Sequence, residues 1–101
     1  MSKFVLAYQG GSMATTEEAI KASMAEWGQW FADLGAAVVD GGNPFGAATK
    51  VTADGRADAA SGITGYSILD ASDLEAAAAL AKGCPVLAHG GSVDVYEALE
   101  M

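Results

Sequence analysis

Residues 4–8, Phe4-Val5-Leu6-Ala7-Tyr8, form a continuous apolar run with no helical period, and the pair Gly10-Gly11 follows it. A short apolar run of this kind predicts a β-strand that is buried on both faces. The rest of the chain, or a second chain, must therefore cover two sides of this strand.

The next segment has the pattern of a long amphipathic helix. Apolar residues recur there at steps of four, three, four and three, at Ile20, Met24, Trp27, Phe31 and Leu34. Such residues lie on one stripe of a helix, here about five turns long. Thr15 and Glu18 have capping-box spacing ahead of the stripe, and Gly35 follows its last residue.

Three more strands and a second helix are predicted further on. Apolar composition predicts strands at 36–40 and 65–70, and alternation of apolar and polar residues predicts one at 92–96. Ser72 and Glu75 have capping-box spacing ahead of a helix that ends before Gly83-Cys84-Pro85.

Residues 45–64 are open to two interpretations. The pair Asp54-Gly55 favours a small hairpin with a two-residue turn, whereas the Ala and Gly content is equally consistent with a loose loop.

This order predicts one α+β domain over residues 1–101, with a ferredoxin-like βαββαβ plan and an antiparallel sheet that has two helices on one face. The first strand is apolar on both sides, so the sheet face without helices also needs cover. We expect a second copy of the same chain there, sheet against sheet, in a homodimer.

Charge and composition narrow the classes of partner. Five Lys and Arg stand against thirteen Asp and Glu, a net charge of −8, and 51% of the residues are apolar. Phosphate backbones and anionic lipids repel such a chain, so we expect neither a nucleic acid nor a membrane as partner. No signal-peptide pattern opens the sequence and no apolar run reaches membrane-spanning length, which predicts a cytoplasmic protein.

The chain has one cysteine, Cys84, and one histidine, His89. A single cysteine cannot form an intrachain disulfide, and one residue of each kind does not make a typical zinc site. The paired glycines lack the spacing of phosphate-binding loops. We therefore expect no metal and no cofactor, and we interpret Cys84 as a small buried apolar residue.

Two residues are candidates for proton transfer. Asp40 ends a predicted strand, where its carboxylate could point into a cavity. His89 carries the imidazole that ordinarily titrates near neutral pH, and Asp40 is a candidate to orient it. The alternative is that His89 is an exposed loop residue without a catalytic role.

Other residues are candidates for ligand binding. Tyr8 and Tyr66 lie on strands that we expect to be neighbours, and their hydroxyls could reach a cavity between the sheets. Trp30 lies at the edge of the helical stripe, and Asn43 belongs to a turn. The alternative is ordinary packing of the tyrosines within the sheet and of Trp30 over the core.

Several segments together resemble the YCII-related proteins. They are Lys3-Phe4-Val5-Leu6-Ala7-Tyr8, Trp27-x-x-Trp30 before Leu34-Gly35, Val39-Asp40-Gly41-Gly42-Asn43-Pro44, Gly65-Tyr66-Ser67-Ile68, Gly83-Cys84-Pro85 and Gly90-Gly91-Ser92-Val93-Asp94-Val95-Tyr96. The resemblance extends over nearly the whole chain. It implies a dimeric α+β barrel, in which two ferredoxin-like sheets face each other around a shared interior.

The resemblance implies less about chemistry, because most members of that family have no assigned activity. Some have a proposed His–Asp active site, with the His on the first helix and the Asp near a Gly-Pro turn, and a few relatives are associated with dehydrochlorination of an aromatic ring. Asp40 is the nearest match to that Asp here. The helix positions around Glu26 and Trp27 carry no histidine, so His89 would have to take its place in space.

Three hypotheses follow from these patterns. The first is a homodimer that holds a small, largely apolar ligand in the cleft between its sheets without catalysis. The second is a lyase or dehydrohalogenase-type enzyme in which Asp40 or His89 accepts a proton. The third is a structural dimer whose interior is filled by its own side chains.

Overall fold

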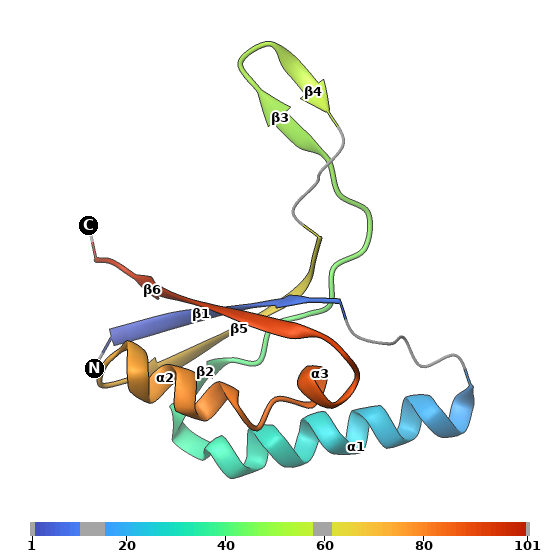
Figure 1. Ribbon diagram of the computed structural model, residues 1–101, viewed down its shortest axis with the longest axis vertical. Helices are drawn as coiled ribbons and strands as arrows, with labels where there is room; N and C mark the ends of the chain where they lie inside the picture. The colour runs from blue at the N-terminus through green and yellow to red at the C-terminus, as the bar shows by residue number, and fades with distance from the viewer. Residues whose placement is uncertain (1, 11–15, 58–61, 101) are drawn as a thin grey trace.

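The computed structural model describes residues 2–10, 16–57 and 62–100. A four-stranded sheet in the order β2-β5-β1-β6 forms its centre, and a separate two-stranded hairpin, β3-β4, stands off the sheet (Figure 1). The sheet strands are β1 (Ser2–Gln9), β2 (Val38–Asp40), β5 (Ile63–Ala71) and β6 (Ser92–Ala98). Every strand pair in the sheet is antiparallel.

Three helices lie on one side of the sheet: α1 (Glu17–Leu34), α2 (Leu74–Ala81) and the one-turn helix α3 (Pro85–Ala88) (Figure 1). The predicted α+β architecture and its helix-covered face are therefore confirmed. The segment after α2 differs from the prediction, because Pro85 does not simply follow the end of a helix. It begins α3, where its fixed φ suits a first helical position.

The second predicted strand, at 36–40, is only partly correct. Residues Gly35–Ala37 form a short 3-10 helix, and the strand β2 begins at Val38. Gly35 ends α1, as predicted, and has a φ of 56°. Its N–H donates back to the Phe31 carbonyl, and the chain makes one more tight turn before it extends.

The hairpin interpretation of the middle segment is correct. β3 (Lys50–Thr52) pairs with β4 (Gly55–Ala57), and Ala53 and Asp54 form the turn, one residue before the predicted pair Asp54-Gly55. Gly55 has a φ of 135°, a conformation that favours glycine.

Both predicted helix caps are displaced by one residue. Thr16, not Thr15, caps α1, because its hydroxyl accepts a hydrogen bond from the Ala19 N–H at 3.1 Å. Thr15 itself lies outside the described residues. At α2 the cap is Asp73, whose carboxylate accepts from the Ala76 N–H at 2.8 Å. In each case two adjacent residues can cap a helix, and only the neighbouring backbone decides between them.

The two faces of the sheet are assigned by the alternation along β1. Phe4, Leu6 and Tyr8 point toward the helices and are almost fully buried. Val5 and Ala7 point to the opposite side, which we call the open face. No helix of the described residues lies on the open face, as Figure 1 shows.

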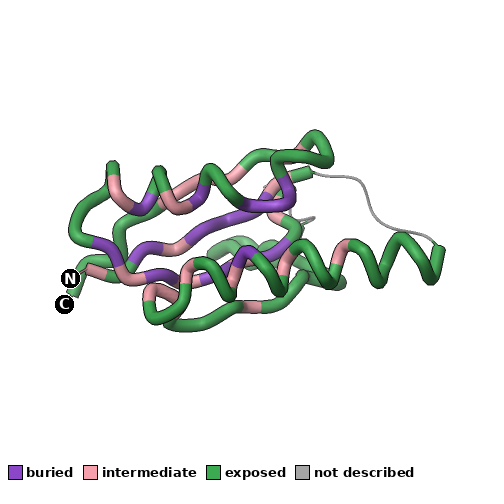
Figure 2. Tube along the Cα trace, turned by 90° about the horizontal axis from the view of Figure 1, so that it is seen from below, coloured by how far each residue is buried: buried purple, intermediate pink, exposed green. Residues whose placement is uncertain are grey.

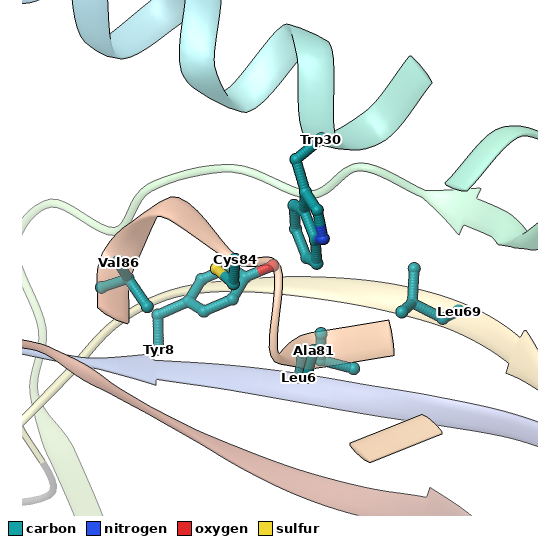
Figure 3. Close-up of a cluster of buried hydrophobic side chains, with 7 residues drawn as sticks. All are labelled: Leu6, Tyr8, Trp30, Leu69, Ala81, Cys84 and Val86. Atoms are coloured by element: carbon teal, nitrogen blue, oxygen red, sulfur yellow. The ribbon is translucent and has the colours of Figure 1, made fainter. Parts of the chain in front are cut away.

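The main core lies between the sheet and the helices. Trp30 of α1 points toward β1 and β5 and packs with Leu6, Leu69 and Tyr8 (Figure 3). Its indole N–H donates to the Leu80 carbonyl at 3.2 Å, so its polar atom is satisfied inside the core.

The helix α1 is longer than the sheet that it covers. Its first turns extend beyond the sheet and are almost entirely exposed (Figure 2). Ile20 and Met24, which the sequence pattern places on the buried stripe, are 45% and 69% exposed. Trp27 is half-buried, whereas Trp30 at the predicted edge of the stripe is the buried residue.

Among the described residues, none of the helices combines the length and the apolar character needed to cross a lipid bilayer.

Candidate functional site

A cluster of polar and aromatic side chains lies where β2 ends against β5. The hydroxyl of Tyr66 donates to Asp40 Oδ2 at 3.3 Å, and the rings of Phe45 and Tyr66 stack with their centroids 5.7 Å apart. The Asn43 carbonyl accepts from the Tyr66 N–H at 3.4 Å. We call Asp40, Asn43, Phe45 and Tyr66 the Asp40 cluster. Three of its members were singled out by the sequence, and Phe45 was not.

The turn that follows Asp40 depends on glycine. Gly42 has a φ of 75°, and a Cβ atom built on it would lie 1.7 Å from the Tyr66 carbonyl oxygen. The turn therefore packs its backbone directly on β5. Asp40 Oδ1 accepts a hydrogen bond from the Gly42 N–H at 2.8 Å, which orients the carboxylate while Oδ2 contacts Tyr66.

A buried chain of hydrogen bonds lies beneath this turn. The Tyr8 hydroxyl donates to Ser67 Oγ at 2.6 Å, and Ser67 Oγ donates to the Gly41 carbonyl at 2.7 Å. Ser67 is fully buried. Burial raises the pKa of Tyr8 above its ordinary value. This chain ties the residue next to Asp40 to the core of the sheet.

Tyr8 and Tyr66 do not share a surface, although their strands are neighbours as predicted. Tyr66 lies opposite Ala7, and Tyr8 lies opposite Gly65. Side chains at successive positions point to opposite faces, so Tyr66 lies on the open face and Tyr8 on the helix side. The predicted role of Tyr8 in a cavity between sheets is therefore wrong, and the buried Trp30 is also on the helix side.

The open face carries three rows of side chains across β5, β1 and β6. They are Tyr66, Ala7 and Asp94; Ile68, Val5 and Tyr96; and Asp70, Lys3 and Ala98. The middle row is apolar apart from one hydroxyl, and carboxylates lie in the two outer rows. Asp94 accepts a hydrogen bond from the Gln9 side chain at 2.9 Å. The Asp40 cluster borders the first row through Tyr66.

His89 has a different carboxylate partner from the predicted one. Its Nε2 lies 3.0 Å from Oε2 of Glu26 on α1, and both side chains are partly exposed, at 41% and 47%. Since 63 positions separate the two residues, no local pattern could have revealed the pair.

An open groove of about 670 Å³ runs beside this pair. It is lined by Glu26, Trp30 and Asp33 of α1 and by Lys82 and Cys84 after α2. Cys84 is buried, as predicted, and burial raises the pKa of its thiol to about 11. A protonated thiol is a poor nucleophile, so Cys84 serves packing here.

The structure does not bring Asp40 and His89 together. Asp40 contacts Tyr66 on the open face, whereas His89 contacts α1 in the helical layer on the other side of the sheet. In the part of the chain that the structure describes, no group of three or more His, Cys, Asp or Glu residues is arranged to hold a metal ion.

The fold and the Asp40 cluster define a small α+β domain with one helix-covered sheet face and one open face that has polar groups at its end. A family model of the YCII-related domain matches residues 1–101, and the chain belongs to the YCII-related family. No curated protein and no solved structure matches the chain.

Proposed function

We propose that the chain acts as a homodimer in which the two open faces pack together and enclose a small, largely apolar ligand beside the Asp40 cluster. The observation that carries this proposal is the apolar middle of the open face. Val5, Ile68 and the ring of Tyr96 lie there on the side of the sheet without helices. Tyr96 is 56% exposed. An apolar sheet face of this kind is typical of an interface.

The finer architecture that we propose is a dimeric α+β barrel made of two ferredoxin-like sheets. The strand order β2-β5-β1-β6 and the uniformly antiparallel pairing support it. Membership of the YCII-related family supports it too, since resemblance to that family implies such a barrel. In this arrangement the interior lies between the two open faces.

The ligand would meet two kinds of surface at the Asp40 cluster. The stacked rings of Phe45 and Tyr66 offer an apolar wall, and Phe45 is 50% exposed. Asp40 Oδ2 is an acceptor that already takes one hydrogen bond from Tyr66. This combination suits a compact molecule with an apolar body and one hydrogen-bond donor.

The alternative is an enzyme of the lyase or dehydrohalogenase type, in which a base removes a proton from the ligand. The structure favours Asp40 over His89 as that base. Asp40 is exposed at the open face and is held by Gly42 and Tyr66, whereas His89 is engaged with Glu26 on the helix side. The same carboxylate would accept a hydrogen bond in the binding protein and a proton in the enzyme.

The first test is the mass of the protein in dilute solution, measured by sedimentation equilibrium over a series of concentrations. The proposal expects a dimer at micromolar concentration. A monomer throughout the series would refute both the interface and the enclosed site.

The second test is ligand binding, with N-phenyl-1-naphthylamine as an apolar fluorescent probe that carries one N–H donor. Asp40→Asn should weaken its binding about tenfold, because a hydrogen bond to a charged acceptor contributes about 1.5–3 kcal/mol. Asp33→Asn, an exposed carboxylate on α1, is the matched control and should bind as the native chain does. Equal binding by both variants would remove Asp40 from the site.

A further inference from the structure

The β3-β4 hairpin is the least supported element of the fold. All of its residues are exposed, and Val51 is 75% exposed. Figure 1 shows that it projects from the side of the four-stranded sheet opposite the helices and extends away from that sheet. An isolated two-stranded hairpin is only marginally stable in water. An apolar side chain on this exposed hairpin therefore suggests that a surface of another molecule covers it.

The charge of the hairpin contrasts with that of the chain. Residues 50–57 contain Lys50, Arg56 and Asp54, which gives +1 in a chain of net charge −8. Two of the five basic residues of the whole sequence are thus in this short segment. Val51 and Arg56 are directly opposite each other in the hairpin, so one face of the hairpin presents an apolar and a basic side chain together.

The open face of the sheet has the complementary pattern. Its middle row offers Val5 and Ile68, and its outer rows offer the carboxylates of Asp94 and of Asp70, the latter opposite Lys3. The hairpin cannot use this surface in its own chain as it stands, because its residues are exposed and it points away from the sheet. A second copy presents the same open face.

We propose that the hairpin of each protomer is an arm that lies over the open face of the other. Val51 would then contact apolar side chains at the rim of that face, and Arg56 would pair with one of the carboxylates in its outer rows. This inference rests on the proposed homodimer. Both arms project on the same side as the open faces, so face-to-face packing brings each arm to the opposite sheet.

The arm also adds to the proposed ligand site. It connects to the sheet through the segments that adjoin the Asp40 cluster, because β3 follows Phe45 and β4 precedes Tyr66 along the chain. In the dimer each arm would close the cleft from the rim, with Arg56 as a basic group among acidic ones. A single protomer lacks this closure, so the site would be complete only in the dimer.

The test is a charge reversal in the arm, Arg56→Glu, with Lys21→Glu as the matched control. Lys21 is an exposed basic residue of α1, so both variants change the net charge equally. Sedimentation equilibrium at low salt should give a dimer dissociation constant raised about tenfold or more by Arg56→Glu, since it places like charges in contact. Lys21→Glu should leave the constant within about twofold of the native value.

A second substitution that restores the dimer would identify the surface that Arg56 contacts. Arg56→Glu combined with either Asp94→Lys or Asp70→Lys re-creates an opposite-charge pair, and one of the two combinations should recover the native constant. Far-UV circular dichroism checks that each variant is folded.

The outcomes of this test distinguish a failure of the proposed arm from a failure of the proposed dimer. A native chain that is monomeric at all concentrations refutes the proposed function itself. A native dimer that Arg56→Glu weakens no more than Lys21→Glu refutes the arm and leaves the dimer standing. Weakening by Arg56→Glu without recovery in either combination refutes the pairing with the open face.

Discussion

Replacement of Gly42 by alanine tests the close packing of the turn that carries Asp40. Gly42 has a φ of 75°, and an added Cβ would lie 1.7 Å from the Tyr66 carbonyl oxygen and 2.6 Å from its carbonyl carbon. Both atoms belong to the backbone of β5 and cannot rotate away. The turn must therefore lift off the sheet to accommodate even one methyl group.

The expected loss in the free energy of unfolding has two parts. A residue with a side chain loses about 1–2 kcal/mol in the left-handed region. Lifting the turn also weakens the bond from the Tyr66 N–H to the Asn43 carbonyl and that from Ser67 Oγ to the Gly41 carbonyl, each of which contributes about 0.5–1.5 kcal/mol. Gly42→Ala should thus reduce the free energy of unfolding by about 2–5 kcal/mol, a large share of the stability of a small domain.

Two glycines of the same chain provide matched controls. Gly35 has a φ of 56° and a ψ of −124° but no atom within 4 Å of its added Cβ, so Gly35→Ala isolates the conformational cost and should lose about 1–3 kcal/mol. Gly28 lies within α1 with open space around it, and Gly28→Ala should gain up to about 1 kcal/mol from helix propensity.

Urea unfolding at one fixed protein concentration, followed by tryptophan fluorescence, measures all three variants. Both tryptophans lie on α1 and contact the core, so their emission reports the loss of tertiary packing. If Gly42→Ala costs no more than Gly35→Ala, the turn does not pack on β5 as closely as described, and the argument for a rigidly held Asp40 fails.

Three further variants or measurements test neighbouring parts of the structure. Ser67→Ala should cost about 1–3 kcal/mol in urea unfolding, because the buried Tyr8 hydroxyl and Gly41 carbonyl lose their shared partner; a cost below that of Tyr8→Phe would contradict the hydrogen-bond chain. Burial raises the pKa of Cys84 from 9.0 to about 11, so the protonated thiol contributes stability that is fully present below pH 9 and is lost as the pH rises toward 11. Native protein should accordingly react with iodoacetamide far more slowly than urea-unfolded protein at pH 8, and equal rates would show that Cys84 is accessible. Glu26→Gln should change the free energy of unfolding by less than about 1 kcal/mol, because the pair with His89 is partly exposed; a larger loss would mean that the pair holds α3 in place.

Most of the secondary structure could be predicted because its signals are local. The apolar run at residues 4–8 and the helical stripe before Gly35 each correspond to an element of the structure, and the hairpin turn lies one residue before the predicted pair Asp54-Gly55. Local signals fail where two neighbours have the same chemistry. Ser72 and Asp73 both can cap a helix, and the backbone conformation places the cap at Asp73.

The burial of α1 shows a second limit of prediction from the sequence. The apolar stripe begins at Ile20, but the sheet beneath the helix does not extend that far. Trp30 is also buried in the core, whereas Trp27 on the predicted stripe is only partly buried. Periodicity identifies the apolar side of a helix, but it contains no information on the length of the sheet or on small rotations.

The sequence predicted individual residues of the candidate site but not the contacts between them. Asp40 was chosen from its place at a strand end, Asn43 from its turn and Tyr66 from its strand next to that of Tyr8, and the structure brings the three together. Their proximity depends on the pairing of β2 with β5, which a single sequence does not specify. The partner of His89, Glu26, was missed for the same reason.

The position of β6 at the edge of the sheet has a consequence for storage of the protein. No described strand pairs with its outer side, so the amide and carbonyl groups of alternate residues point outward and can bond to another chain. Asp94 and Glu97 place negative charge along this edge, and mutual repulsion keeps two such edges apart at neutral pH. Concentrated salt screens this repulsion, so we expect fibrous aggregates to form first through this edge when the protein is stored at high salt.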